Sequence, residues 1–287
     1  MNSLLQTATT LATLGATGLA AYHHVGYPVL LRAMRRTEAA PAALADSVLP
    51  AITVIMPAYN EANYIAAKLR NIAALDYPAH RLRVQVICDG CTDETASIAR
   101  ATLREANCEH LDASIVDCTE NRGKVAVLND AVAAVRDEIV VLTDVSAMLP
   151  ADALRRAAVH FADPALGAVG GTYRLAQAGC AGESTYWAVQ LGVKLGEAAL
   201  GAPLGLHGAF YAFRRVAWAP LSPDTINDDF ILPMRMFAEG WRIAYDPTIV
   251  ALEAEQPDAA ASLRRRRRIA AGNAQQLVQL RDQLHPQ

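Results

Sequence analysis

The chain has neither a large excess of charge nor a regular set of cysteines. Its net charge is only −3 over 287 residues, which argues against nucleic acid as the main partner. Its five cysteines are an odd number in a long chain, which makes a disulfide framework improbable. Cys88 and Cys91 form a CxxC at the end of a predicted strand, without a second pair at zinc-ribbon spacing. We interpret the cysteines as reduced and structural.

Charge is also absent from one long stretch near the N-terminus. No Asp, Glu, Lys or Arg occurs between Leu4 and Leu31, and about 20 apolar residues suffice to cross a bilayer. Five threonines, three glycines and two histidines dilute this stretch, so a helix lying on the membrane or packed on the domain is the alternative. Three arginines follow within residues 32–36, and the positive-inside rule places the rest of the chain in the cytoplasm. We predict a transmembrane or membrane-associated helix over residues 1–36, at the cell membrane.

The remaining chain divides by composition and periodicity. Residues 37–50 are rich in Ala and Pro and are predicted to be a linker. A single folded domain is predicted over 51–275, with halves 51–148 and 149–275, followed by a tail over 276–287. The composition is 53% apolar, which is enough for a substantial core.

The half over 51–148 alternates between strand and helix patterns. Strands are predicted at 51–56, 83–88, 113–116 and 139–146, and helices directly after Asn60 through about residue 72, from Thr92 to about residue 106 and over 125–135. Asn60 and Thr92 are predicted to cap the first two helices. Such alternation favours a mostly parallel central sheet flanked by helices, with right-handed crossovers. No GxGxxG or Walker motif occurs at a strand end, so a dinucleotide-binding turn and a P-loop are excluded.

Polar residues instead follow several of these strands. Glu61, Asp89 and Asp144 lie at or just after three strand ends, and Lys124 lies in a Gly-Lys loop. Open α/β sheets bind ligands at the carboxyl ends of their strands. Carboxylates can bind ribose, base or metal, and a lysine can bind phosphate. The pattern indicates a nucleotide diphosphate with a metal, although Asp144 taken by itself could equally well cap the next turn.

Four motifs in this order resemble the family-two glycosyltransferases, which have the Rossmann-like GT-A fold and include cellulose, chitin and hyaluronan synthases. The motifs are Pro57-Ala58-Tyr59-Asn60-Glu61, Asp89-Gly90-Cys91-Thr92-Asp93, Asn121-Arg122-Gly123-Lys124 with the residues that follow it, and Asp144-Val145-Ser146. The resemblance extends over roughly residues 50 to 275 and implies a nucleotide-sugar donor, most simply a UDP-sugar.

The resemblance also implies individual roles. Pro57, Ala58 and Glu61 would line the nucleoside pocket, and Asp89 would contact the uracil or ribose. Lys124 would lie near the diphosphate, and Asp144 would bind a divalent metal, Mn²⁺ or Mg²⁺. The family motif Asp-x-Asp reads Asp-x-Ser here, because Ser146 replaces the second carboxylate. Serine is a weak ligand, so the metal would depend on Asp144, the phosphates, water or another side chain.

The half over 149–275 carries the motifs expected to contact the acceptor. Predicted elements are a strand over 166–173, a helix over 184–200 and a strand from residue 241. The segment around His207 and Gly208 resembles the family's Gly-rich segment beside the donor sugar and acceptor. A histidine there could bind sugar hydroxyls, phosphate or metal, but a structural role is the simpler interpretation.

Asp228 and Asp229 begin a predicted helix that runs to Gly240. An inverting glycosyl transfer needs a base to deprotonate the attacking hydroxyl, and adjacent like charges raise one pKa. The family places this base at the second carboxylate, here Asp229, with Asp228 supporting it. Helix capping by Asn227 or Asp228 is compatible with that role.

Five consecutive arginines occupy residues 264–268. Alone they would suggest a membrane-surface or nucleic-acid patch. The family has Gln-x-x-Arg-Trp here, of which only Arg268 is kept, and Ile269 replaces the tryptophan on which processive synthases stack their polymer. The segment from Gln275 to Leu284 is predicted to be a short helix.

These observations predict an inverting glycosyltransferase that acts on a glycan or lipid-linked acceptor in cell-envelope or exopolysaccharide synthesis. One alternative is a degenerate subunit of a membrane complex that binds the nucleotide without turnover, which Ser146 and the missing tryptophan favour. A nucleotidyltransferase shares this sheet but leaves the Asp228-Asp229 motif and the arginine run unexplained.

Overall fold

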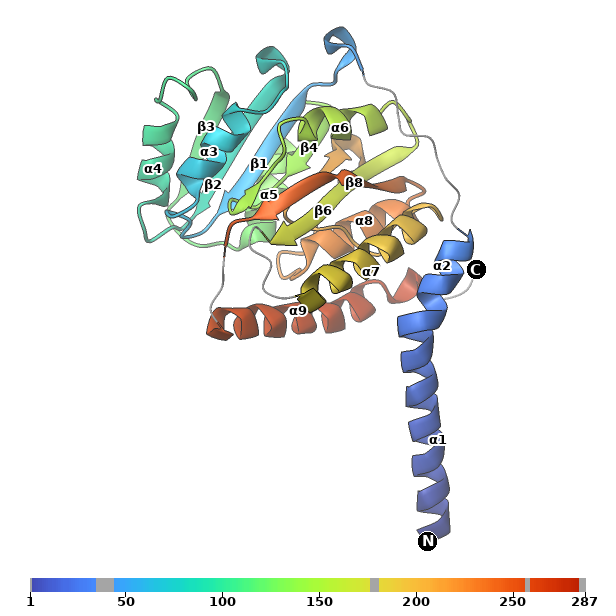
Figure 1. The fold of residues 1–287 in the computed structure, drawn as a ribbon. Coiled ribbons are helices and arrows are strands. Elements are labelled where there is room, and N and C mark those ends of the chain that lie inside the picture. Colours follow the sequence, from blue (N-terminus) through green and yellow to red (C-terminus); the bar gives the residue numbers. More distant parts are fainter. Residues whose placement is uncertain (1, 35–43, 176–180, 256–258, 284–287) are drawn as a thin grey trace.

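The structure, a computed structural model, describes residues 2–34, 44–175, 181–255 and 259–283 (Figure 1). A helical rod projects from an α/β domain and carries the N-terminus at its far end. The rod consists of α1 (Asn2–Ala21), a π-helical turn (Tyr22–Gly26) and α2 (Tyr27–Met34).

The two helices of the rod have different surroundings. Leu11, Leu14 and Leu19 of α1 are 63–69% exposed. In contrast, Leu31 of α2 is buried, and α2 packs against α7 (Ala181–Ala198). Within the described ranges, no helix is long and apolar enough to cross a membrane, so the expectation of a spanning helix lacks support. The alternative of packing on the domain is confirmed for α2.

The domain is built on one sheet with the strand order β3-β2-β1-β4-β7-β6-β8-β5. The strands are β1 (Ile52–Ala58), β2 (Leu82–Asp89), β3 (Asp112–Cys118), β4 (Ile139–Leu142), β5 (Ala147–Met148), β6 (Leu166–Leu175), β7 (Tyr211–Arg214) and β8 (Arg242–Glu253). The strands β3, β2, β1 and β4 are parallel, as the strand and helix alternation predicted. However, β7 runs antiparallel to both of its neighbours, and β5 is antiparallel to β8. The complete sheet is therefore mixed, although four of its pairings are parallel.

Helices cover both faces of this sheet (Figure 1). They are α3 (Ile65–Ala73), α4 (Thr95–Thr102), α5 (Lys124–Ala134), α6 (Ala153–His160), α8 (Asp228–Ala238) and α9 (Ala259–Gln279), together with α7. Alternate residues of a strand point to opposite faces. Accordingly, Val54 packs in the cluster with α3, α4 and α6, whereas Ile55 packs in the cluster with α5 and α8. Burial of each such side chain contributes roughly 1.5–3 kcal/mol.

The first two helices begin later than predicted, and neither predicted cap is used. Helix α3 starts at Ile65, whereas Asn60 lies five residues earlier with a positive φ of 57°. The Asn60 Oδ1 instead accepts a hydrogen bond from the Thr92 N–H at 2.8 Å. Asp93 replaces Thr92 at the start of α4, because its Oδ1 accepts the Thr95 N–H at 3.0 Å. The Asn60 side chain therefore connects two loops at the carboxyl edge of the sheet.

Two predicted boundaries also need correction. The arginine run and Gln275 belong to one helix, α9, so the predicted tail does not begin a separate helix at Gln275. Of the predicted linker, residues 37–43 lie outside the described residues. The described part includes a 3-10 turn over Asp46–Val48 and the buried Leu49. This part belongs to the domain.

Candidate active site

The loop before α5 is held by Asp89 at the end of β2. Asp89 is buried, and its Oδ1 and Oδ2 accept the N–H groups of Arg122 and Gly123, each at 2.8 Å. Gly90 has a φ of 65°, and a Cβ there would lie 2.2 Å from the Asn121 nitrogen. Only glycine therefore lets the two loops approach in this way. The buried carboxylate fixes the loop that places Lys124 at the start of α5.

Lys124 reaches from α5 toward two carboxylates on other elements. Its Nζ lies 3.5 Å from Asp144 Oδ1, after β4, and 3.3 Å from Asp228 Oδ1, at the start of α8. Burial lowers the pKa of Lys124, but Asp228, Asp144 and Asp229 outweigh burial and raise it above the usual range. The lysine therefore stays protonated and can bind phosphate.

The two adjacent carboxylates of α8 are held differently. Asp228 is buried, and its Oδ2 accepts the Tyr211 hydroxyl at 3.0 Å. The Oδ2 of Asp229 accepts the Gly208 N–H at 3.0 Å. Burial, followed by the negative charge of Asp228, raises the pKa of Asp229 to about 6. A carboxylate with a pKa near the working pH is suited to act as a general base.

Gly208 lies where these groups converge. A Cβ at this position would lie 3.3 Å from Asp144 Oδ2, 3.6 Å from Asp229 Oδ2 and 3.7 Å from Lys124 Nζ. These three groups come from the loop after β4, from α8 and from α5. Any side chain at residue 208 would contact or displace them, so glycine keeps this point open.

A cavity of about 310 Å³ lies beside this cluster. Its lining residues are Pro57, Glu61, Lys124, Asp144, Val145, Ser146, Glu253, Glu255, Arg265 and Arg268. The predicted nucleotide residues Pro57, Glu61, Lys124, Asp144 and Arg268 therefore share one cavity. Ala58 and Asp89 do not line it, and the Asp89 carboxylate is instead hydrogen-bonded to the loop before α5. Their predicted nucleotide contacts, including that of Asp89 with uracil or ribose, remain predictions.

The cavity brings acidic and basic groups together. Burial, then the charges of Glu255 and Asp144, raise the pKa of Glu61 to about 7. The Arg265 guanidinium lies over the Tyr173 ring, 5.9 Å from its centroid. With Arg268 and Lys124, it gives the cavity three cationic side chains that could bind a diphosphate.

His207 lies between two aromatic rings. Its ring centroid is 6.1 Å from that of Tyr173 and 6.0 Å from that of Tyr245. Burial, followed by the charge of Lys194, lowers the pKa of His207 to about 4. The imidazole is therefore neutral at physiological pH and unsuited to bind phosphate as a cation. Contact with the acceptor remains a prediction for both His207 and Gly208.

The donor atoms near Asp144 determine what metal site the chain could form. In the parts of the chain that the structure describes, no three His, Cys, Asp or Glu side chains lie together as a metal site. The Asp144 side chain is 39% exposed, whereas Ser146 is buried. Mg²⁺ sites commonly use one or two carboxylates with substrate phosphates and water. These residues fit a cation bound mainly by a diphosphate, with Asp144 as its protein carboxylate.

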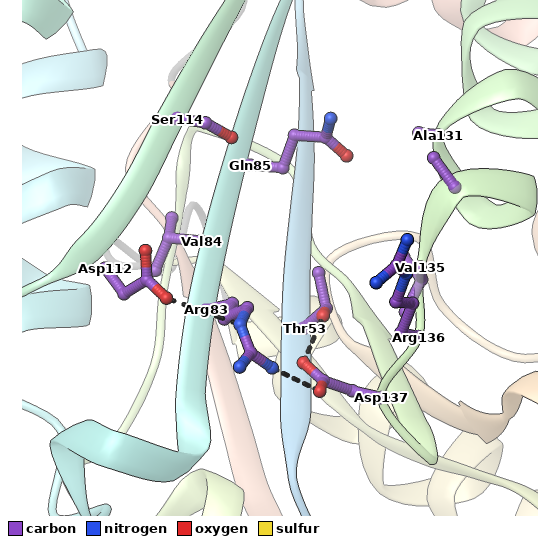
Figure 2. Close-up of a pocket in the computed structure, with 11 residues that line it drawn as sticks. Thr53, Arg83, Val84, Gln85, Asp112, Ser114, Ala131, Val135, Arg136 and Asp137 are labelled. Atoms are coloured by element: carbon purple, nitrogen blue, oxygen red, sulfur yellow. Dashed lines mark hydrogen bonds and ion pairs between the residues drawn. The ribbon is translucent and has the colours of Figure 1, made fainter.

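A second hollow, of about 440 Å³, lies at the amino edge of the same strands (Figure 2). There Arg83 lies between Asp112 and Asp137, and its Nε is 3.3 Å from Asp112 Oδ2. Asp137 is buried and also accepts the Thr53 hydroxyl at 2.7 Å. These charged and polar groups bind one another. We therefore interpret them as a network that stabilises the fold.

Some residues at the candidate site were not found from the sequence. Glu253, Glu255 and Arg265 line the cavity, and Tyr211 binds Asp228. The alternation of Glu253 and Glu255 at the end of a strand was an available signal. Nothing local to Tyr211 indicated its partner, because the bond depends on the insertion of β7 beside β4.

The family model described as "Glycosyltransferase like family 2" matches residues 50–272. This match includes every element that contributes to the cavity. The chain belongs to glycosyltransferase family 2. The resemblance inferred from the motifs is thus confirmed, and this glycosyltransferase has a GT-A-like fold.

Solved structures of other glycosyltransferases share the fold. A mannosyltransferase from Pyrobaculum calidifontis, in complex with GDP-Man and Mn²⁺, is 31% identical with a TM-score of 0.74, covering 88% of this chain and 71% of that chain. The TarS protein of S. aureus in complex with UDP-GlcNAc is 18% identical with a TM-score of 0.53, covering 72% of this chain and 59% of that chain. At this identity the second likeness concerns the fold alone.

Curated relatives extend beyond the matched region. The poly-β-1,6-N-acetyl-D-glucosamine synthase of Staphylococcus aureus is 30% identical over 207 residues, 69% of this chain and 48% of the relative. The β-monoglucosyldiacylglycerol synthase of Synechocystis sp. is 31% identical over 146 residues, 48% of this chain and 30% of the relative. The chain therefore spans about half the length, or less, of these curated relatives.

Proposed function

We propose that this glycosyltransferase transfers a sugar with inversion from a nucleotide-sugar donor, most simply a UDP-sugar, to an acceptor hydroxyl. The observation that carries the proposal is the convergence of Lys124, Asp144 and Asp229 around the open position at Gly208. This arrangement provides a cation for the leaving diphosphate and a base for the acceptor within a few ångströms of each other. The similar mannosyltransferase that holds GDP-Man supports a nucleotide-sugar donor. The nucleobase of the donor is decided by the panel of sugars below.

The reaction follows from these groups. The acceptor oxygen attacks the anomeric carbon while the bond from that carbon to the diphosphate oxygen breaks, which inverts the configuration. Asp229 takes the proton from the acceptor hydroxyl, and its raised pKa makes it basic enough to hold that proton. Lys124, Arg265 and Arg268 offset the charge of the diphosphate as it leaves.

Asp228 keeps Lys124 and Tyr211 in place and remains buried. A divalent cation, Mn²⁺ or Mg²⁺, would be held by Asp144 and the donor phosphates and would supply further stabilisation of the leaving group. The mannosyltransferase that is similar to this chain is in complex with GDP-Man and Mn²⁺, which supports such a cation. Ser146 adds no carboxylate, so the bound nucleotide is needed for tight binding of the cation.

The direct test compares wild type with Asp229→Asn on a panel of UDP- and GDP-sugars with Mn²⁺ or Mg²⁺. Transfer or hydrolysis of one donor is expected from the wild type, with strong loss in the variant and unchanged nucleotide binding. Glu239→Gln is the matched control, because it neutralises an exposed carboxylate just beyond the end of the same helix. Nucleotide binding without turnover of any donor would support the degenerate, non-catalytic alternative instead.

We also infer that the N-terminal rod associates with a membrane, with the catalytic domain on the cytoplasmic side. The support is the uncharged α1 and its exposed Leu11, Leu14 and Leu19, because an apolar surface of this kind calls for a covering partner. A glycan or lipid-linked acceptor in envelope or exopolysaccharide synthesis fits this location.

The location is tested in the full chain. Leu11→Lys combined with Leu14→Lys is expected to abolish flotation with zwitterionic phosphatidylcholine vesicles, to which added lysines are not attracted, whereas transfer to a soluble acceptor persists. Thr10→Ser combined with Thr13→Ser is the matched control on the same helix. Flotation of the lysine variant at the wild-type level would contradict the membrane proposal.

A further inference from the structure

Helix α2 is joined to the domain by close packing and one hydrogen bond. Leu31 is buried against α7, and a Cβ at Gly196 would lie 2.7 Å from the Leu31 Cβ. One helical residue further, the Glu197 Oε1 accepts the Tyr27 hydroxyl at 2.8 Å. This bond joins residues 170 positions apart in the sequence. The end of the rod is thus connected to a buried carboxylate of the catalytic domain.

The second oxygen of Glu197 holds a loop that leads to the candidate active site. Its Oε2 accepts the Leu204 N–H at 2.8 Å, and Glu197 is only 5% exposed. Lys194, on the preceding turn of α7, donates to the carbonyl oxygens of Leu204 and Gly205. Side chains of helix α7 therefore hold the start of the loop over residues 204–208, because they bind both N–H and C=O groups of the loop backbone.

The other end of this loop contacts Asp229. The Leu206 N–H donates to the Asp229 carbonyl oxygen at 2.7 Å, and the Gly208 N–H donates to Asp229 Oδ2 at 3.0 Å. A continuous set of contacts consequently runs from Tyr27 through Glu197 and the loop to Asp229. Each step in it is a hydrogen bond to a buried or half-buried group, where misplacement is costly.

We propose that Tyr27 and Glu197 are positioning residues that hold the 204–208 loop against Asp229, so that the N-terminal rod forms part of the acceptor side of the active site. The proposal rests on the proposed function in one respect, the role of Asp229 as the base. The geometry explains why the Glu197 carboxylate is buried between α2 and the loop. One of its oxygens accepts a hydrogen bond from α2, and the other accepts one from the loop. Movement of α2 away from α7 removes one of these donors and loosens the loop.

The first test uses Tyr27→Phe, which removes the hydroxyl and keeps the ring. Amide hydrogen exchange at Leu204, Leu206 and Gly208, measured without substrate, is expected to accelerate roughly tenfold, as on loss of a hydrogen bond to a charged group. The kcat for transfer is expected to fall about tenfold, whereas the KM for the donor is unchanged. Tyr22→Phe, at an exposed tyrosine of the same rod, is the matched control with neither effect.

A purely structural role for the bond would lower the melting temperature while loop exchange and kcat stay at the values of the Tyr22→Phe control. That result would overturn the proposal. Unchanged exchange at the three loop amides would overturn it even if kcat fell, because the loss would then not pass through the loop.

The second test adds Glu197→Gln, which retains one carbonyl acceptor and places an NH₂ group against the other donor. Exchange and kcat are expected to change as in Tyr27→Phe, and the double variant to show less than the summed effects. Additive effects on exchange and kcat would mean that Tyr27 and Glu197 act independently, and would overturn the proposal. The exchange measurement needs no substrate, so accelerated exchange together with a fully active Asp229→Asn would reject the proposed base and retain the positioning role.

Discussion

The two edges of the strands β3, β2, β1 and β4 carry charged clusters of opposite character. At the amino edge, Arg83 lies between Asp112 and Asp137, and Thr53 completes the hydrogen bonding of Asp137 (Figure 2). At the carboxyl edge, Lys124 contacts both Asp144 and Asp228, with Asp229 beside them. At the amino edge, one arginine and one hydroxyl bind two carboxylates, whereas at the carboxyl edge three carboxylates gather near one lysine.

This difference shows how one sheet separates stability from chemistry. At the carboxyl edge, burial and the adjacent Asp228 raise the pKa of Asp229. Perturbed carboxylates of this kind are concentrated at functional sites. Substitutions at the carboxyl edge should therefore change turnover, and those at the amino edge should change folding.

The largest effect is expected for Asp229→Asn. Loss of the base should lower kcat about 10²–10⁴-fold, and the Asn side-chain carbonyl can still accept the Gly208 N–H, so the fold is retained. Steady-state kinetics and circular dichroism measure the two effects. Asp137→Asn at the amino edge is the comparison and should keep its kcat; equal losses in both variants would remove the distinction between the edges.

Next in size is Lys124→Met. It leaves Asp144 and Asp228 without their cation and removes a charge that would bind the diphosphate. Nucleotide affinity should fall about 10–100-fold, as measured by calorimetry with UDP and GDP. Arg83→Met also removes a cation but should leave nucleotide affinity unchanged. Weakened binding in the Arg83 variant would show that the amino edge takes part in the site.

The pH dependence gives a smaller effect. Because Asp229 must be ionised to accept a proton, kcat should rise with pH and level off above about 6, falling about tenfold per pH unit below that value. Removing the neighbouring charge with Asp228→Asn should move the midpoint of the profile to lower pH. A midpoint that stays in place would mean that another group controls the profile.

The smallest effect is expected for Thr53→Val at the amino edge. It removes the hydroxyl that donates to the buried Asp137, and the free energy of unfolding should fall by about 1–2 kcal/mol. Urea unfolding measures this change, and kcat should stay at the wild-type value. A fall in kcat without a change in stability would contradict the assignment of this edge to folding.

Local patterns in the sequence were sufficient for much of the fold. The periodicity predicted β1 to β4 and α3 to α5 within a few residues, because apolar spacing reports which face of an element is buried. It also indicated that Lys124 and Asp144 would meet, since parallel strands present their carboxyl ends at one edge. The caps at Asn60 and Thr92 were wrong, because the Asn60 side chain instead accepts hydrogen bonds from the N–H and the hydroxyl of Thr92.

The amino-acid sequence by itself determined the strand and helix alternation, the family and the candidate residues Lys124, Asp144 and Asp229. Only the tertiary structure placed β7 between β4 and β6, which brings Tyr211 to Asp228 and the 204–208 loop to Asp229. It likewise assigned Asp89 to holding a loop and connected Tyr27 to Glu197. The physical reason is separation along the sequence. Periodicity reflects the local environment of each residue, whereas contacts between residues distant in the sequence depend on strand order and helix packing.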